Sequence, residues 1–436
     1  MARRGGDQRA VRVAVLGCGN VGGGLVALLL ADADGIAERS GVRLELAGVA
    51  VADPGRFRPG VPAGLVTADA KGLVMSPDVD VVVELIGGID PARQLVEAAL
   101  GAGKAVVTAN KALLAAHGAA LARMADGAGV DLLYEAAVAG AIPIIRPLRE
   151  SLAGERVRRV MGIVNGTTNF ILTTMAEDGV GYEAALAEAQ ALGFAERDPT
   201  ADVEGHDAAA KAAILAGLAF RCDVVDSDVH REGITGIPAS DVAFADRLGY
   251  VVKLLAVGER AGEDQVSVRV HPALVPKTHP LASVRGVFNA VFVEGESSGE
   301  LMLYGRGAGG VPTASAVLGD VIDAAHNVLA GTAAPAPARV RARLQPMEDV
   351  RSAYYLSIEV ADRPGVLAAV AAVFGEHRVS IRSMEQEGLG DEARLVFVTH
   401  VAREGDVRAT LAGLEALPAV DHVSAVLRVV GEEGSP

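Results

Sequence analysis

The stretch VRVAVLGCGNVG, residues 11–22, decides the fold of the first part of the chain. A short apolar strand runs to Leu16, the pattern G-x-G-x-x-G follows at once, and an apolar helix then continues through Leu30. In this setting the first glycine makes a tight turn, the second lets the backbone approach a pyrophosphate, and the third allows close helix–strand packing. The N–H groups at the start of the helix favour phosphate. The stretch predicts a Rossmann-type domain in which the cofactor contacts include Gly17, Gly19, Asn20, Val21 and Gly22.

The acid beyond the second predicted strand, 44–51, bears on the choice between NAD and NADP. This acid is Asp53, and it stands farther beyond Gly22 than the ~20 residues usual in the fold, because the polar insert 31–43 intervenes. Asp53 would hydrogen-bond a ribose hydroxyl and repel a 2′-phosphate, whereas Arg56 would pair with one. Alternatively, Asp53-Pro54-Gly55 is only a turn. The sequence leaves both cofactors open.

Three further segments, 79–86, 105–108 and 131–135, are apolar and rich in β-branched residues, which is typical of buried parallel strands. Ligands bind beyond the carboxyl ends of such strands, so we expect Ile86 and Thr108 to contact the cofactor. A second glycine-rich loop, 306–313, precedes a predicted helix, 314–330. We expect this segment to return the chain to the first domain, with Gly309 near the cofactor. The predicted dinucleotide-binding domain is 1–140 plus the returning helix 310–335.

The stretch ALGFAERDPTADVEGHDAAAK, residues 191–211, concentrates five carboxylates before one lysine. Asp198-Pro199 marks a turn, because a residue before proline is pushed out of the helical region. From Asp207 the sequence favours helix, so Asp207 and Lys211, four residues apart, share one helix face. An exposed ion pair is the simple alternative. The Ala-rich, apolar character of this helix instead favours an internal lysine, which requires partners and a reason.

This stretch resembles the signature of the homoserine dehydrogenase family. The matching residues are Ala191, Gly193 (at a narrower spacing than the pattern), Phe194, Ala195, Asp198, Pro199, Asp202, Val203, Gly205, Asp207 and Lys211. The resemblance implies reversible NAD- or NADP-dependent reduction of L-aspartate 4-semialdehyde to L-homoserine, on the route to threonine, methionine and isoleucine. Residues 141–309 would form an α+β substrate-binding and dimerisation domain. Its strands are expected near 157–164, 266–275, 284–294 and 300–304, and its helices include 183–192 and 207–220.

The implied reaction assigns roles to individual residues. Lys211 would donate a proton to the developing alkoxide and act as the base in reverse, and Asp207 would orient Lys211 and bind the substrate. Glu196 would bind the substrate ammonium, and the backbone of Gly193 would approach the cofactor. The resemblance also places Lys111 near the nicotinamide and the substrate, although a lysine after a strand is commonly just solvated.

The segment after the strand 131–135 resembles the family's monovalent-cation site, formed by Glu135 and the carbonyls of Val138, Gly140 and Ile142. A carboxylate with backbone carbonyls suits a hard cation such as Na⁺. A glycine-rich crossover without metal is the alternative. The Asn165–Asn169 segment, NGTTN, predicts a capped helix start after a strand.

The C-terminal region, 350–436, follows a Pro/Ala-rich linker candidate at 332–339 and shows a βαββαβ order typical of ferredoxin-like domains. Its strands are predicted at 354–360, 379–386, 394–401 and 419–430. The turn Asp362–Leu367, DRPGVL, resembles an ACT domain, in which amides near Gly365 would bind an amino-acid carboxylate. Threonine is the expected effector, and the domain is expected to be a detachable sensor. A dimerisation module without ligand is the alternative.

The composition limits the classes of partner that we expect for this protein. With 436 residues, half of them hydrophobic, the chain has room for two or three domains. A net charge of −15 argues against nucleic acid or anionic membrane as partners, and no apolar run approaches the ~18 residues of a membrane span. Two cysteines and the lack of a signal peptide favour the cytoplasm. We expect a homodimer or homotetramer.

Two other functions share part of these sequence features. A non-catalytic, cofactor-binding amino-acid sensor would keep the glycines and the C-terminal domain but would not need Lys211 with Asp207 and Glu196. An acylating semialdehyde dehydrogenase needs a thiolate nucleophile. Cys18 lies within the phosphate loop and Cys222 follows an apolar helix, so neither is placed for that chemistry.

Overall fold

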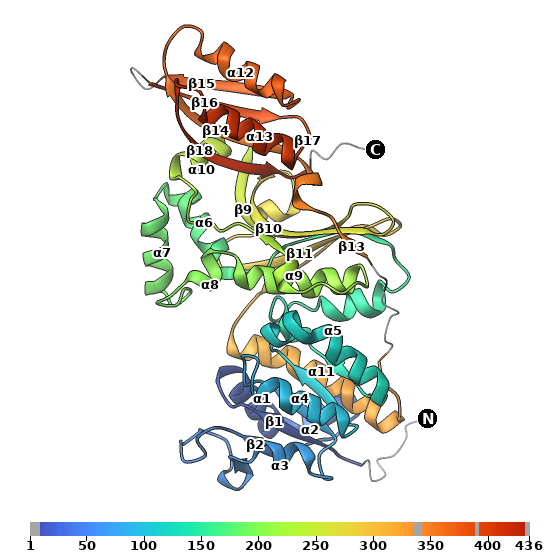
Figure 1. The fold of residues 1–436 in the computed structure, drawn as a ribbon. Helices are drawn as coiled ribbons and strands as arrows, with labels where there is room; N and C mark the ends of the chain where they lie inside the picture. The colour runs from blue at the N-terminus through green and yellow to red at the C-terminus, as the bar shows by residue number, and fades with distance from the viewer. Residues whose placement is uncertain (1–8, 335–339, 341, 389–391, 432–436) are drawn as a thin grey trace. The chain divides into compact units, whose positions relative to one another are not determined.

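The computed structural model describes residues 9–334, 340, 342–388 and 392–431 (Figure 1). They form two compact units. The first comprises residues 1–156, 213–226 and 303–340, and the second comprises 157–212, 227–302 and 341–436. Within the linker candidate, positions 335–339 lie outside the described residues.

The first unit contains a six-stranded sheet in which every neighbouring pair is parallel. In spatial order the strands are β3 (Val66–Thr67), β2 (Leu44–Ala50), β1 (Val11–Leu16), β4 (Val81–Glu84), β5 (Ala105–Thr108) and β6 (Leu132–Leu133). This arrangement confirms the predicted Rossmann-type sheet. The last strand is shorter than expected, because Glu135 begins a 3₁₀ turn, η2 (Glu135–Ala137).

Helices cover both faces of this sheet, each over its own core (Figure 1). One face carries α1 (Asn20–Ala31), α2 (Ala33–Ser40) and α11 (Gly310–Ala330); the other carries α3 (Ala70–Met75), α4 (Ala92–Gly101) and α5 (Lys111–Ala128). Strand β1 serves both cores, since Val13 and Val15 point to one and Ala14 and Leu16 to the other. This is the alternation expected of a strand buried on both faces.

The second unit is built on a mixed sheet. The strands along its main path are β12 (Gly299–Arg306), β11 (Phe288–Gly295), β7 (Val157–Ile163), β9 (Tyr250–Arg260), β10 (Gln265–Pro276), β18 (Val420–Val429), β14 (Arg351–Ala361), β16 (Glu392–Thr399) and β15 (Ile381–Gly388). Short strands β8 (His230–Arg231) and β13 (Arg343–Leu344) pair with β10, and β17 (Ala402–Arg403) pairs with β14. The long strand β9 was not among the predicted elements.

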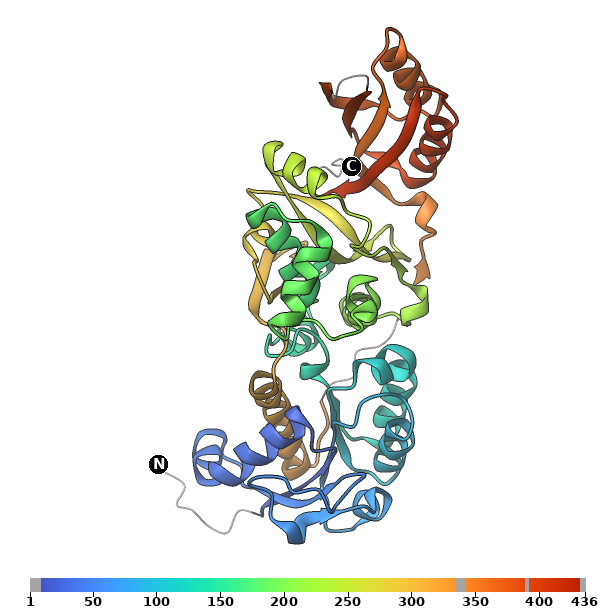
Figure 2. The same cartoon turned by 90° about the vertical axis from the view of Figure 1, so that its left-hand side faces the viewer.

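The helices of this unit lie in two groups. Those before residue 250 are α6 (Gly166–Asp178), α7 (Tyr182–Ala191), α8 (Thr200–Val203), α9 (His206–Ala219) and α10 (Ala239–Arg247). In the C-terminal part, α12 (Val366–Glu376) and α13 (Glu404–Glu415) share one core with β14 and β16 (Figure 2). The order β14-α12-β15-β16-α13-β18 confirms the ferredoxin-like prediction. Short helical turns of the second unit are η5 (Pro280–Ser283) and η6 (Met347–Asp349), those of the first are η1 (Ala63–Leu65) and η3 (Pro147–Ser151), and η4 (Asp226–Asp228) spans the boundary in the chain.

Strand β18 continues the C-terminal sheet into the strands of the middle part of the chain. Ala273 of β10 pairs in parallel with Arg428, and Leu274 pairs with Val429. The Val430 N–H donates to the Leu274 carbonyl at 2.9 Å. These backbone hydrogen bonds make one sheet of both parts, and the detachable sensor stays a prediction.

Among the described residues, no single helix is both long and apolar enough to cross a membrane. Helices α1 and α2 reach that length and hydropathy only when taken together, and the chain bends by 83° between them.

Candidate active site

Lys211 and Asp207 form a buried pair on the first turns of α9. The Lys211 Nζ donates to Asp207 Oδ2 at 2.6 Å and to the Val164 carbonyl at 2.7 Å. Each residue is 8% exposed. The exposed-pair alternative is thus excluded, and the internal lysine predicted from the Ala-rich helix is confirmed. An ammonium has three N–H donors, and these two bonds hold it in one orientation.

Asn165 connects the segments that surround this pair. Its Nδ2 donates to Asp207 Oδ2 at 2.9 Å and to Asp202 Oδ1 at 2.6 Å. Its Oδ1 accepts from the Thr168 N–H at 2.9 Å, which caps α6 as the NGTTN segment predicts. The sequence indicated the cap but not the bridge between two carboxylates. Asn165 serves as both cap and bridge because an amide side chain donates through its nitrogen and accepts through its oxygen.

The local sequence explains how the pair is presented. Pro199 ends the loop, α8 makes one turn, and Gly205 then adopts φ +79° before α9 begins. This left-handed conformation is natural for glycine. It lets the chain reverse between two short helical segments, so that Asp202 and Asp207 both reach Asn165.

The loop between α7 and α8 carries Glu196 and Gly193, and both are exposed. Side chains from two helices hold the loop. Thr167 Oγ1 donates to the Phe194 carbonyl at 2.7 Å, and Gln190 Nε2 donates to the Glu196 carbonyl at 3.0 Å. Because Thr167 stands two residues after Asn165, the first of these bonds ties the loop to the helix start that binds Asp207.

In the first unit, the glycine loop has the tight packing that the pattern predicts. Gly17 has φ +92°, and a Cβ there would lie 2.5 Å from the Leu85 carbonyl oxygen. A Cβ on Gly22 would collide with the Gly17 carbonyl oxygen. Gly19 has no heavy atom within 4 Å of such a Cβ and is exposed. The first and third glycines therefore serve packing, and the second presents open backbone at the start of α1.

The second glycine-rich loop lies beside this helix start. Gly310 packs against the backbone of Asn20, where an added Cβ would lie 3.1 Å from the carbonyl oxygen. Gly309 has φ +126°, a conformation reserved for glycine, and caps α11. The first unit thus brings Gly309 and Asn20, both predicted cofactor contacts, to neighbouring positions.

A buried glutamate, Glu84, organises the ends of β4 and β5. Its Oε1 accepts from the Ile86 N–H at 2.8 Å, and its Oε2 accepts from the Thr108 hydroxyl at 2.6 Å. The Asn110 N–H donates to Thr108 Oγ1, and Asn110 Nδ2 donates to the Gly88 carbonyl at 2.6 Å. Sequence reasoning missed Glu84 and Asn110. The sequence feature that points to Glu84 is the position of a charged residue inside the apolar run VVVELI.

Ile86 and Lys111 are exposed at this carboxyl edge of the sheet. Ile86 is 40% exposed and precedes Gly87 and Gly88, where an added Cβ would meet nothing within 4 Å. Lys111 is the first residue of α5. The edge therefore presents open backbone, one apolar side chain and one lysine.

Asp53 lies in an exposed turn after β2. Its Oδ1 accepts from the Gly55 N–H at 2.9 Å, and its carbonyl accepts from Arg58 at 2.9 Å. The carboxylate therefore stabilises its own turn, as one of the two readings of the sequence expects.

The groups of the candidate cation loop fit a bound cation only in part. Both carboxylate oxygens of Glu135 accept backbone N–H bonds, from Ile145 at 2.7 Å and from Arg146 at 2.9 Å. Within the described part of the chain, no hydrogen bond reaches the carbonyls of Val138, Gly140 or Ile142. The three carbonyls thus fit a hard cation, whereas the Glu135 carboxylate already has a structural role.

A second buried acid, Asp320 on α11, stands behind this loop. Its Oδ2 accepts from the Glu135 N–H at 2.7 Å. Burial raises the pKa of Asp320 to about 7, an effect that this hydrogen bond opposes and that the charge of Glu135 reinforces. This contact has no local sequence pattern, because it joins residues far apart in the chain.

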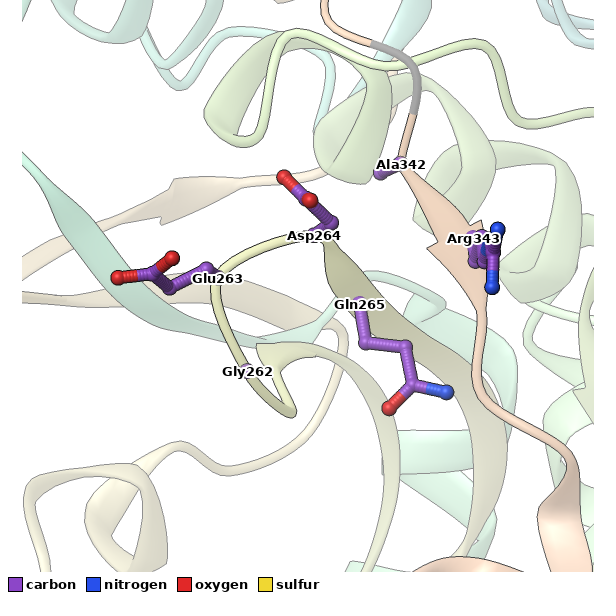
Figure 3. Close-up of a pocket in the computed structure, with 6 residues that line it drawn as sticks. All are labelled: Gly262, Glu263, Asp264, Gln265, Ala342 and Arg343. Carbon is purple, nitrogen blue, oxygen red and sulfur yellow. The ribbon is translucent and has the colours of Figure 1, made fainter.

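A hollow of about 890 Å³ lies elsewhere in the second unit. It is lined by the hairpin turn Gly262, Glu263, Asp264 and Gln265 with Ala342 and Arg343 of the strand that pairs beside it (Figure 3). Figure 3 shows both carboxylates turned away from Arg343. None of its lining residues belongs to the 191–211 stretch or to the glycine loops, so this hollow is not the candidate active site.

Comparison with known proteins agrees with this geometry. Three family models match: "Homoserine dehydrogenase, NAD binding domain" over residues 17–135, "Homoserine dehydrogenase" over 143–322 and "ACT domain" over 354–419. A homoserine dehydrogenase of Mycobacterium tuberculosis is 52% identical over 437 residues, covering 98% of this chain and 99% of that protein.

Solved structures are similar as well. A homoserine dehydrogenase from Thiobacillus denitrificans superposes with a TM-score of 0.92 at 40% identity, covering 97% of this chain and 98% of that one. A hyperthermophilic archaeal homoserine dehydrogenase in complex with NADPH has a TM-score of 0.61 at 30% identity, covering 72% of this chain and 98% of that one.

A dinucleotide cradle, a catalytic domain with a buried lysine–aspartate pair and a C-terminal ACT domain together define a nicotinamide-dependent oxidoreductase of amino-acid metabolism. More narrowly, the chain belongs to the homoserine dehydrogenase family.

Proposed function

We propose that the chain catalyses the reversible NAD- or NADP-dependent reduction of L-aspartate 4-semialdehyde to L-homoserine, with Lys211 as the proton donor. The observation that carries this proposal is the buried pair in which Asp207 and the Val164 carbonyl aim the Lys211 ammonium. The cofactor, when bound, supplies the hydride. The protein must hold the aldehyde and deliver one proton to its oxygen.

Lys211, Asp207 and Asn165 each have a separate role. Lys211 donates to the oxygen that gains negative charge on reduction and recovers the proton in the reverse direction. Asp207 holds Lys211 in place and accepts from the substrate. Asn165 fixes the Asp207 carboxylate by donating to Oδ2, which leaves the aspartate one orientation. Preorganisation of this kind lowers the cost of reaching the transition state.

The direct test is an assay of homoserine-dependent change in nicotinamide absorbance, with NAD and NADP compared. Turnover with homoserine supports the proposal. An absence of turnover with both cofactors, from a protein that binds either of them, would favour a cofactor-binding sensor.

Glu196 is expected to bind the substrate ammonium, because it is an exposed carboxylate on the loop tied to α6. Glu196→Ala should raise KM for homoserine by about tenfold, the loss of one hydrogen bond to a charged group, and should leave KM for the cofactor unchanged. The control is Glu188→Ala, which removes an exposed carboxylate from α7. An unaltered KM in the Glu196 variant would confine that acid to a role in the loop.

Asp53 is expected to disfavour the 2′-phosphate of NADP. Asp53→Ala should improve kcat/KM for NADP relative to NAD on the order of fivefold, the effect of removing about 1 kcal/mol of repulsion between charges in water. The control is Glu45→Ala, an exposed carboxylate on β2. If the ratio does not move, Asp53 acts only in its turn. Arg56 would then be the next residue to replace.

The remaining assignments are part of the same proposal. Contacts to the cofactor are assigned to Gly17, Gly19, Asn20, Val21, Gly22, Ile86, Thr108, Lys111, Gly193 and Gly309. Na⁺ would be held by the carbonyls of Val138, Gly140 and Ile142 beside Glu135, where it would stabilise the loop. The proposed domains are 1–140 with 310–335, then 141–309, then 350–436. Cytoplasmic location is also proposed.

Regulation by threonine and assembly into a homodimer or homotetramer are proposed on the C-terminal domain and the sheet ends. Gly365 caps α12 with φ +92° and starts a helix whose amides suit a carboxylate. Strand β12 lies at one end of the sheet and exposes Leu301 and Met302 at 37% and 38%. An exposed apolar edge strand favours pairing with a second chain.

A further inference from the structure

Arg428 occupies the strand shared by the two parts of the second unit. It pairs with Ala273 of β10 on one side and with Tyr354 of β14 on the other. Its side chain is 6% exposed and binds two carboxylates. One belongs to Glu232, directly after β8, and the other to Glu404, the first residue of α13.

The Arg428 guanidinium binds each of the two carboxylates through two of its nitrogen atoms. Nη1 and Nη2 donate to Glu232 Oε2 and Oε1, each at 2.8 Å. Nε donates to Glu404 Oε2 at 3.0 Å, and Nη2 donates to Glu404 Oε1 at 2.8 Å. The Tyr354 hydroxyl also donates to Glu404 Oε2, at 2.6 Å. Paired bonds of this kind fix geometry as well as charge.

The ionised form of Glu232 is strongly stabilised in this cluster. Burial alone would raise the pKa of Glu232, but hydrogen bonds from His230 and Arg428, with the charge of Arg428, hold that pKa far below its usual range. Breaking one side of a buried ion pair leaves an uncompensated charge. Arg428 therefore fixes the side chain of Glu232, while the Glu232 N–H, which donates to the Val270 carbonyl at 2.8 Å, binds its backbone to β10.

Glu232 begins a turn, residues 232–235, that supports the segment before α9. The Ile234 N–H donates to the Val203 carbonyl at 2.9 Å, and Thr235 Oγ1 donates to Glu204 Oε1 at 3.0 Å. A Cβ on Gly233 would lie 2.5 Å from the Val203 carbonyl oxygen. The 232–235 turn and segment 203–205 are thus packed backbone against backbone.

Segment 203–205 leads directly to the catalytic pair. A Cβ on Gly205 would lie 3.4 Å from the Glu232 carbonyl oxygen, and α9 begins at the next residue, His206. A shift of the 232–235 turn must therefore move the start of α9, which carries Asp207 and Lys211. A displacement of ~1 Å at reacting groups can cost on the order of 10²-fold in rate.

We propose that Arg428 is a positioning residue of the active site, which fixes Asp207 and Lys211 through Glu232, the 232–235 turn and segment 203–205, and so couples the C-terminal domain to catalysis. This inference rests on the roles proposed above for Asp207 and Lys211. A ligand or partner that shifts β18 then acts on the rate through this chain of contacts.

The structure supplies a matched control. The Tyr355 hydroxyl of β14 donates to Asp241 Oδ1 of α10 at 2.6 Å, and both residues are buried. This contact joins the same two parts of the unit as the Arg428–Glu232 pair. It does so without touching the 232–235 turn, so a purely structural role for both contacts predicts equal effects of their removal.

The test compares Glu232→Gln with Tyr355→Phe in steady-state assays on the full-length enzyme. Glu232→Gln should lower kcat on the order of tenfold with KM for the cofactor unchanged, and Glu232→Asp should recover part of the loss. Tyr355→Phe should lower the melting temperature but leave kcat within about twofold. The inference is overturned if kcat survives Glu232→Gln, or if Tyr355→Phe costs as much.

A double-mutant cycle tests the route itself. The effects on kcat of Arg428→Lys and Thr235→Val should be non-additive, because both act on the 232–235 turn, whereas those of Tyr355→Phe and Thr235→Val should add. Additive effects in the first cycle would overturn the route. Should Glu232→Gln not fold, Glu232→Asp and this cycle carry the test. Failure of the proposed catalytic role shows separately, as retained activity in a Lys211→Ala variant assayed alongside.

Discussion

Lys211→Ala is expected to lower kcat for homoserine oxidation by about 10²–10⁴-fold, the usual contribution of a positioned general acid or base. The variant should still fold and bind cofactor, because the glycine loops belong to the other compact unit. Steady-state kinetics and a cofactor-binding titration measure the two quantities. Asp207→Asn should lower kcat less, since an amide still accepts one hydrogen bond from Lys211.

A second buried lysine provides the control for Lys211. Lys253 is 3% exposed and donates to Asn169 Oδ1 at 2.9 Å and to the Val284 carbonyl at 2.6 Å. Burial lowers the pKa of Lys253 to about 8. Lys253→Met should change thermal stability with little effect on kcat. If both variants lose activity equally, loss of a buried ammonium explains the result better than proton transfer does.

Gly365→Asp is expected to abolish inhibition by threonine while the uninhibited rate is kept. Coupling between an effector site and an active site is commonly 5–150-fold in affinity, and that factor should fall to about one. Gly365 stands at the start of α12 with φ +92°, so Asp there also strains the backbone, although nothing lies within 4 Å of an added Cβ. A new carboxylate would repel that of the effector from the helix amides. Initial rates over a range of threonine concentrations measure the change.

Gly375→Asp controls for the added charge. Gly375 lies in the last turn of the same helix, is exposed, and also has nothing within 4 Å of an added Cβ. This variant should keep threonine inhibition. Truncation before Arg351 is a poorer test, because it removes β18 from β10 and takes Arg428 from Glu232. A full-length enzyme that ignores threonine would remove threonine as the effector.

Much of the site was predictable because its information is local. The spacing of Asp207 and Lys211 defines one helix face, and the alanines around them predict burial. The glycines at positions 17, 19 and 22 stand in a pattern that is recognisable from the local sequence, because only glycine readily adopts the positive φ of Gly17. The ferredoxin-like order of the C-terminal domain follows from strand and helix patterns of ordinary length.

What the sequence did not reveal depends on contacts between distant segments. Strand β9 was missed since its apolar run includes Lys253, whose partners Asn169 and Val284 come from other elements. The bridging role of Asn165 needs Asp202 and Asp207 to meet. Neither the pairing of β18 with β10 nor the placement of Asp320 beneath Glu135 has a pattern in the local sequence.

Helix α11 has a consequence for the order in which this protein can be completed during synthesis. Ala314, Val317 and Val321 fill the same core as Val13 and Val15 of the first strand. A growing chain folds from its N-terminus as it leaves the ribosome. The part of this sheet face that α11 covers must therefore stay uncovered, from the first strand at residue 11, until about 300 further residues have been added. For most of translation, this part of the nascent sheet is therefore open to non-native contacts.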